Sequence, residues 1–167
     1  MDYPYISVIV PAYNAEKYIR RCLDSLRQQT LHNIEVIIVN DGSTDNTPSI
    51  IDEYAKQDER FKTFHTSNHG VAFARQFALE RTSGEYVIHV DADDWVDVTL
   101  LENLYITAKQ SNADFVLCDF CTHANNASEE KKLLPTSFNQ TSFFLDLLLV
   151  KFSSALWNKL ILTEIGK

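Results

Sequence analysis

The sequence predicts an α/β protein built on an open, mostly parallel sheet with helices on both of its faces. Five short apolar runs, rich in β-branched residues, alternate with four stretches of helical periodicity, an order typical of parallel sheets. The apolar runs are compact and contain few polar residues, which indicates strands buried on both faces. Of the 167 residues 45% are hydrophobic, and only four are Gly and four Pro, so a disordered chain is excluded.

The first two strands and the helices after them are the most clearly marked elements. Residues 6–10 and 34–39 are β-branched runs and are predicted as strands. A helix is predicted over residues 15–29, because apolar side chains recur there at i, i+3, i+4 and i+7: Ile19, Cys22, Leu23 and Leu26. A cap at Asp45 or Asn46 and a Pro in the first turn predict the start of the second helix.

The same alternation continues along the chain. Residues 61–66 predict a third, weaker strand, and a helix is expected after Gly70. Residues 86–90 predict a fourth strand that runs directly into a cluster of acidic residues. A fourth helix over residues 100–108 and a fifth strand over residues 114–118 complete the expected order.

Past about Thr122 the regular pattern ends. Residues 124–132 are polar and predict a loop. A helix is expected near residues 141–150, and residues 156–162 resume a strand-like pattern.

Charge, cysteines and hydropathy limit the classes of function. With 15 Lys and Arg against 23 Asp and Glu, the net charge of −8 argues against nonspecific binding to nucleic acid. Three Cys cannot form a disulfide framework, and Cys118 and Cys121, spaced as C-x-x-C, are expected to be incidental thiols. Without a signal peptide or a membrane-length apolar run, we expect a cytoplasmic protein. One apolar stripe either packs on the sheet or contacts the inner face of the membrane: Phe143, Phe144, Leu147 and Leu148.

Polar side chains gather where the predicted strands end. Tyr13 and Asn14 follow the first strand, Asp41 the second, and Asp91 and Asp93 the fourth. Ligands of open α/β sheets bind beyond the carboxyl ends of the strands. Carboxylates that meet at this edge repel one another unless a cation compensates them, and oxygen ligands favour a hard ion such as Mg²⁺ or Mn²⁺. The sequence therefore predicts a divalent-metal site there.

Several nucleotide-binding classes are excluded. The chain has neither the G-x-G-x-x-G of dinucleotide-binding folds nor the G-x-x-x-x-G-K-[ST] of a P-loop. With so few glycines, a bound diphosphate would need a metal bridge instead of a glycine-rich cradle. An aspartyl-phosphate phosphatase carries its nucleophile on the first strand of its fold, whereas Asp-x-Asp follows the fourth strand here.

Four segments, in order and with appropriate spacing, resemble family 2 glycosyltransferases: VIVPAYNAE (8–16), VNDGSTD (39–45), NHGVAFAR (68–75), and GEY (84–86) followed by DADD (91–94). The similarity covers roughly residues 6–119. The segment Trp157-Asn158-Lys159-Leu160 also resembles one found in bacterial polysaccharide-building members. This resemblance implies a GT-A fold, which is Rossmann-like, and a bound nucleotide-diphosphate sugar, most often a UDP-sugar.

The resemblance also implies roles for seven residues. Pro11, Tyr13 and Glu16 would border the nucleoside, and Asp41 would hydrogen-bond the base. The others would act on the rest of the donor: Arg75 on the base or the phosphates, Asp91 on the ribose and sugar, and Asp93 as ligand of the Mn²⁺ or Mg²⁺ on the diphosphate.

The activity that the resemblance implies is a metal-dependent, inverting transfer to a saccharide or lipid-linked acceptor in polysaccharide biosynthesis. In related enzymes the general base is typically the Asp of a Glu-Asp pair after the metal motif, and no such pair follows Asp94. We therefore expect residues 1–122 to be the nucleotide-sugar-binding core and residues 123–167 to begin an acceptor-side region. The general base is expected beyond Lys167.

One alternative function stays open, and another is contradicted by the residues. A module that binds a nucleotide sugar without transferring it is the alternative to an enzyme. A sugar-nucleotide pyrophosphorylase requires a Gly-rich loop after the first strand, whereas this chain has the sequence Pro-Ala-Tyr-Asn at that position.

Taken singly, most of the candidate residues also have ordinary structural explanations. Asp41 suits a turn, Glu16 a first helical turn and Arg75 a solvated helix surface. Asp94 suits a helix cap or a group behind the metal ligand, His89 is expected to pack against a helix, and Trp95 to cover the end of the sheet.

Overall fold

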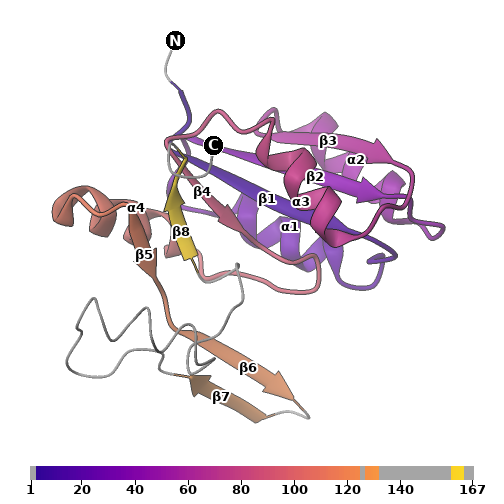
Figure 1. The fold of residues 1–167 in the computed structure, drawn as a ribbon. Coiled ribbons are helices and arrows are strands. Elements are labelled where there is room, and N and C mark those ends of the chain that lie inside the picture. Colours follow the sequence, from indigo (N-terminus) through magenta and orange to yellow (C-terminus); the bar gives the residue numbers. More distant parts are fainter. Residues whose placement is uncertain (1–2, 125–126, 132–158, 164–167) are drawn as a thin grey trace.

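The computed structural model of the chain describes residues 3–124, 127–131 and 159–163. Among these residues a six-stranded sheet has the order β3-β2-β1-β4-β8-β5, and β6 and β7 form a separate pair (Figure 1). The strands are β1 Ile6–Ala12, β2 Ile34–Asp41, β3 Phe61–Thr66, β4 Tyr86–His89, β5 Phe115–Leu117, β6 Phe120–Ala124, β7 Ala127–Lys131 and β8 Lys159–Leu162. The helices are α1 Ile19–Arg27, α2 Thr47–Gln57, α3 Val71–Leu79 and α4 Leu100–Ser111.

The centre of the sheet is parallel, as predicted. β1 pairs in parallel with β2 on one side and with β4 on the other, and β2 pairs in parallel with β3. Every residue of β1 and β2 is buried, because helices cover both faces of these two strands. The predicted α/β class with an open, mostly parallel sheet is therefore confirmed.

Alternate side chains of the central strands enter two cores. On one face α1, α2 and α4 pack on the sheet, and their buried residues form the larger cluster with Val8, Val36 and Ile88. On the other face α3 packs through Ala74 and Ala78 against a smaller cluster. Figure 1 shows α3 on the opposite side of β1 and β2 from α1 and α2. The small side chains of α3 bring that helix close to the strands.

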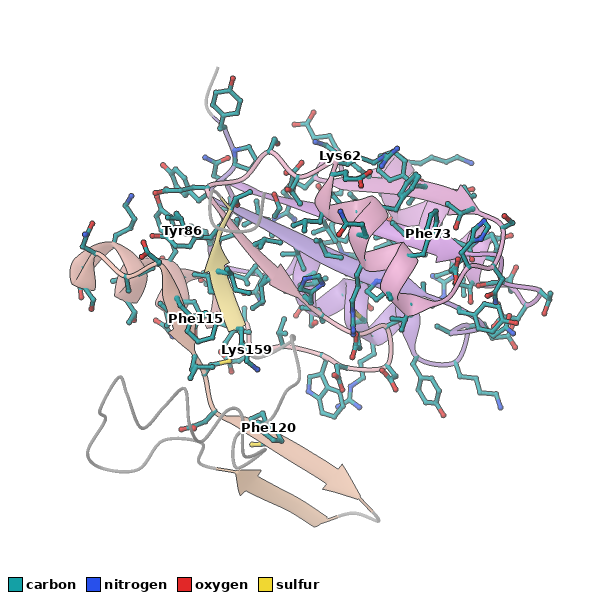
Figure 2. The ribbon with its side chains drawn as sticks, in the orientation of Figure 1. Lys62, Phe73, Tyr86, Phe115, Phe120 and Lys159 are labelled. Atoms are coloured by element: carbon teal, nitrogen blue, oxygen red, sulfur yellow. The ribbon has the colours of Figure 1, made fainter. Side chains whose placement is uncertain are left out.

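The far end of the sheet differs from the expected simple parallel order. β8 lies between β4 and β5 and is antiparallel to both. Tyr86 pairs with Leu162 at one end of β8, and Lys159 pairs with Leu117 at the other (Figure 2). The sheet is therefore mixed. Sequence periodicity marks strands but not the partners that they find at long range, and this explains why β8 was expected only as a strand-like run.

The prediction of a loop over residues 124–132 is wrong. β6 and β7 form an antiparallel pair in which Phe120 is opposite Lys131 and Ala124 is opposite Ala127. The loop was predicted from the polar composition of this segment. Polar residues can nevertheless form a hairpin, because the backbone hydrogen bonds between two strands do not require apolar side chains. The predicted helix near residues 141–150, and Trp157 and Asn158 of the resemblance, lie outside the described residues. In the described part of the chain, no helix combines the length and the apolar composition needed to cross a membrane.

Replacing Gly84 with Ala should lower stability, because β1 passes directly over this glycine. A Cβ there would lie 2.6 Å from the Ser7 backbone nitrogen and 2.9 Å from the Ile6 carbonyl carbon. These are backbone atoms of a central strand and cannot shift cheaply, so overpacking should cost about 2 kcal/mol of unfolding free energy. Urea unfolding measures this cost, and a variant with an unchanged midpoint would contradict the close approach.

Candidate functional site

A cavity of about 460 Å³ opens between the ends of β1 and β4. After β1 the chain forms β2 and β3 on one side and then returns to form β4 on the other, so the strand order reverses here. Open α/β sheets bind ligands at such a point, beyond the carboxyl ends of the strands. Three segments line the cavity: Pro11, Tyr13, Asn14, Ala15 and Tyr18; Val71 and Arg75; and Asp91, Ala92 and Asp93.

The loop after β1 forms an aromatic wall that is held by the loop after β2. Asn14 adopts a positive φ of 49°, and its side-chain oxygen accepts a hydrogen bond of 2.8 Å from the Thr44 backbone N–H. The Ala15 N–H donates to the Thr47 hydroxyl at 2.8 Å. Within this braced loop Tyr13 and Tyr18 remain 52% and 55% exposed. The cavity therefore offers flat apolar surfaces that a planar ligand can contact without moving the backbone.

Glu16 lies in the same loop but does not line the cavity. Its backbone N–H donates to the Asp45 carboxylate at 3.1 Å, and its own carboxylate accepts the Asn46 N–H at 3.0 Å. This reciprocal pair ties the two loops together next to the start of α2, where Asp45 also accepts the Thr47 N–H. Glu16 thus braces the aromatic wall from outside, and its predicted contact with the nucleoside stays a prediction.

The opposite wall carries the acidic motif. Asp91 forms an ion pair with Arg75, with 2.6 Å between a carboxylate oxygen and the guanidinium, and both side chains are largely buried. Asp93 is exposed, and among the described residues it has neither a cationic nor a hydrogen-bonding partner. Burial, and then the negative charges of Asp93 and Asp91, raise the pKa of Asp94. The motif is therefore short of positive charge at Asp93 and Asp94.

A divalent cation fits this shortage. The described residues contain no group of three His, Cys, Asp or Glu side chains that could hold a metal ion alone. Magnesium and similar ions, however, are often held by one or two carboxylates together with substrate phosphates and water. An exposed carboxylate that has no partner among the described residues, at the rim of a cavity large enough for a diphosphate, suits that mode. Asp93 is the residue that would hold the ion.

Asp41 does not line the cavity, although it was expected to meet Asp91 and Asp93 there. It is 3% exposed, and its carboxylate accepts the backbone N–H groups of His69 at 2.9 Å and Gly70 at 2.7 Å. Its charge is therefore compensated by amides at the start of α3. Three uncompensated carboxylates were expected at this edge of the sheet. Arg75 compensates Asp91 as well, so the uncompensated carboxylates are Asp93 and its neighbour Asp94.

His89 is a polar residue in the apolar layer beside this wall. It shares the α3 face of β4 with Val87, because side chains alternate along a strand. Its side chain is 93% buried and its Nδ1 has no hydrogen-bond partner among the described residues. Burial, and then the charge of Arg75, lower the pKa of His89 to about 4. The imidazole is therefore neutral at pH 7.

The cysteine pair provides no second site. Cys118 and Cys121 are not joined to one another by a disulfide. Burial and then the charge of Asp119 raise the pKa of Cys118 to about 11, so this thiol is protonated and a poor metal ligand at neutral pH. Trp95 lines a different depression beside α1, where the Arg21 guanidinium lies 3.0 Å from the centre of its ring.

Five of the seven predicted site residues therefore meet at one cavity: Pro11, Tyr13, Arg75, Asp91 and Asp93. Asn14, which was expected only as a polar residue after the first strand, also lines the cavity. The prediction did not include the remaining lining residues: Ala15, Tyr18, Val71 and Ala92. A sequence signal for Tyr18 and Val71 is that both are large apolar residues beside the start of a helix. The structure leaves both more than half exposed.

Comparison with known proteins identifies the family. Residues 7–156 match Glycosyl transferase family 2. The chain belongs to this family. It is 46% identical over 120 residues to EpsH of Bacillus subtilis, which covers 72% of this chain and 35% of EpsH. It is 42% identical over 124 residues to the glycosyltransferase GlyA of Streptococcus pneumoniae, covering 74% of this chain and 18% of GlyA. This family 2 member thus spans about a third or less of these two relatives.

Solved structures confirm the GT-A fold. TarS of Staphylococcus aureus, residues 1–349 in complex with UDP-GlcNAc, superposes with a TM-score of 0.79 at 26% identity. The match covers 96% of this chain and 46% of that 1–349 chain. The mannosyltransferase PcManGT from Pyrobaculum calidifontis, in complex with GDP-Man and Mn²⁺, superposes with a TM-score of 0.60 at 30% identity. This second match covers 71% of this chain and 36% of PcManGT.

Proposed function

We propose that this family 2 member binds a UDP-sugar in the cavity between β1 and β4 and donates the sugar to a saccharide or lipid-linked acceptor in polysaccharide biosynthesis. The observation that carries the proposal is the composition of the cavity. Exposed aromatic residues form one wall. The other wall carries the Arg75 guanidinium and the Asp93 carboxylate, which has no partner in the described part of the chain. A nucleoside diphosphate has matching parts, namely a planar base, a ribose and a charged diphosphate. The likeness to TarS with UDP-GlcNAc supports uridine as the nucleoside.

Each wall has a proposed part of the donor. Pro11 and Tyr13 border the nucleoside, since the ring of Tyr13 offers an apolar face beside the end of β1. Asp91 faces the ribose and sugar, and Arg75 holds the base or the phosphates while its pairing with Asp91 keeps the guanidinium in place. Glu16 keeps the aromatic wall in position through the loop that it braces.

Asp93 is the proposed ligand of Mn²⁺ or Mg²⁺. When bound, the ion stabilises the negative charge that develops on the departing diphosphate. The likeness to PcManGT with Mn²⁺ supports a divalent ion in this fold. The acceptor hydroxyl attacks the anomeric carbon on the face opposite the leaving diphosphate. The bond between the anomeric carbon and the diphosphate oxygen breaks as the new glycosidic bond forms. The hydroxyl proton passes to a general base, and this single displacement inverts the anomeric configuration.

A thermal-shift screen of the chain with UDP-GlcNAc, UDP-glucose and GDP-mannose, each with and without Mn²⁺, tests donor binding. A ligand at a hundred times its Kd adds about 2.7 kcal/mol of stability, which should raise the Tm by about 5 °C or more. We expect this rise with a UDP-sugar and Mn²⁺ and a much smaller one without the ion. Unchanged melting with every nucleotide sugar at millimolar concentration would contradict the proposal. UDP release upon addition of an acceptor then separates a transferase from a binding module.

A further inference from the structure

His89 lies at the end of β4, inside the apolar layer that α3 covers. It pairs with Ile9 of β1, and both Ile9 and Val87 belong to the cluster beneath α3. Side chains that are paired across neighbouring strands point to the same face of a sheet, so the His89 ring points to the face on which α3 packs. An apolar side chain would suit this layer better than an imidazole whose buried Nδ1 has no partner in the described chain. Packing alone therefore does not explain a histidine here.

Arg75 carries a second buried atom of this kind. Its Nη2 donates to the Asp91 carboxylate at 2.6 Å, but its Nε is buried and has no hydrogen-bond partner among the described residues. Arg75 lines the cavity where β1 and β4 end, and His89 stands two residues before Asp91 on the same edge. Burial, and then the charge of Arg75, lower the pKa of His89 to about 4. The guanidinium therefore acts on a neutral imidazole close to it.

The two atoms are chemically complementary. A neutral imidazole has one nitrogen that accepts a hydrogen bond, and the Nε–H of arginine can only donate one. The described residues contain one further buried side-chain nitrogen or oxygen without a partner, Nη1 of Arg60, which precedes β3 at the opposite edge of the sheet. We propose that His89 is a positioning residue, whose Nδ1 accepts a hydrogen bond from the Arg75 Nε–H. The bond forms directly after a small rotation of the Arg75 side chain, or through one water.

This contact would fix the orientation of the guanidinium at the cavity. Asp91 holds Nη2 at one end of the planar group, and an acceptor at Nε holds it at a second point, so that it cannot turn about the first. A cation that is already oriented binds its ligand more tightly, because less side-chain freedom is lost on binding. His89 itself does not line the cavity, so its effect reaches the donor through Arg75. The effect on donor affinity rests on the proposed function, whereas the contact with Arg75 does not.

Two variants separate the acceptor nitrogen of His89 from the volume of its ring. His89→Asn places an acceptor oxygen near the position of Nδ1, whereas His89→Leu fills the layer with an apolar side chain. NMR without nucleotide measures solvent exchange of the Arg75 Nε–H, whose signal is assigned by its absence in Arg75→Lys. Exchange should be at least about tenfold faster in His89→Leu than in the wild-type chain, and near the wild-type rate in His89→Asn. Equal exchange in His89→Leu and the wild-type chain would overturn the proposal.

This first readout needs no ligand. A wild-type chain that binds no nucleotide would refute the proposed function, and exchange of the Arg75 Nε–H would still test the contact. The same variants also distinguish positioning from packing. Since Leu suits an apolar layer, His89→Leu should keep a urea midpoint near that of the wild-type chain and still weaken UDP binding about tenfold with Mn²⁺ present. A lower midpoint with unchanged UDP affinity would show a packing role and overturn the proposal.

A double-mutant cycle shows whether His89 acts through Arg75. His89→Leu should weaken UDP binding less than about twofold in the Arg75→Ala background, compared with about tenfold in the wild-type background. His89→Asn should stay within about threefold of the wild-type affinity, because it keeps an acceptor for the Nε–H. Equal losses for His89→Leu in both backgrounds, or a loss in His89→Asn as large as in His89→Leu, would overturn the proposal.

Discussion

Replacing Asp93 with Ala should abolish the effect of Mn²⁺ on UDP binding. In the wild-type chain the ion should raise UDP affinity by at least about tenfold, because it neutralises the diphosphate beside a carboxylate that has no other partner in the described chain. Without that carboxylate the ion and the diphosphate lose their common attachment to the protein. Calorimetric titration of UDP with and without Mn²⁺ measures both affinities, and they should become equal in the variant.

The matched control for this prediction is Asp97→Asn. It removes an exposed charge four residues along the chain, while an Asn side chain can still accept the Thr99 N–H that Asp97 binds at 2.9 Å. Its UDP affinity should respond to Mn²⁺ as the wild-type chain does. A persistent response in Asp93→Ala would refute the assignment of this residue as the metal ligand, and loss of the response in Asp97→Asn would point to a general charge effect.

Replacing Glu35 with Ala should destabilise the fold by about 3 kcal/mol, since a buried carboxylate that is bonded on both oxygens leaves its partners unsatisfied. Glu35 lies on β2 far along the strand from Asp41 and accepts hydrogen bonds from Ser7, from the Ser83 N–H and hydroxyl, and from Lys62 at 2.6 Å. Lys62 lies near the start of β3 (Figure 2). Urea unfolding measures the loss. Glu53→Ala, in an exposed ion pair with Arg20, should leave the midpoint nearly unchanged.

The contribution of Glu35 should also depend on pH. Burial alone would raise its pKa, but the hydrogen bonds from Lys62, Ser7 and Ser83 together lower it from the ordinary value of 4.5. A carboxyl whose pKa is lower in the folded state stabilises the fold above its unfolded pKa and loses that contribution as pH falls through the folded pKa. The stability difference between wild type and Glu35→Gln should therefore be full at pH 7 and shrink below pH 4.5. A difference that stays constant to pH 3 would contradict the charged state of Glu35.

Elements that a local sequence pattern defines could be predicted, whereas strand pairing between distant residues could not. Residues 6–10 and 34–39 are compact and β-branched, and the structure contains them as the two fully buried strands β1 and β2. The antiparallel position of β8 between β4 and β5 could not be predicted, because it depends on pairing across more than 70 residues of sequence. The β6–β7 hairpin escaped prediction for a different reason, since its polar residues carry no strand periodicity.

The residues of the site could be identified from motifs, but which of them face the cavity depends on their surroundings in the fold. Asp91, Asp93 and Arg75 were identified from the chain, and they line one cavity. The motif residues Asp41 and Glu16 were identified equally well, but their oxygens accept backbone N–H groups of neighbouring loops. A sequence pattern does not distinguish a carboxylate that faces a ligand from one that holds the loop beside it. The two cases are distinguished by the hydrogen bonds that each carboxylate forms in the structure.

NMR titration of the backbone amides with UDP-GlcNAc and Mg²⁺ tests whether the cavity between β1 and β4 is the donor site, since Mg²⁺ is diamagnetic and leaves the amide resonances sharp. Shifts should concentrate in segments 11–18, 71–75 and 91–93, which contribute the residues that line the cavity. Shifts confined to the depression that Arg21 and Trp95 line, or no saturable shifts at all, would contradict a donor site between β1 and β4.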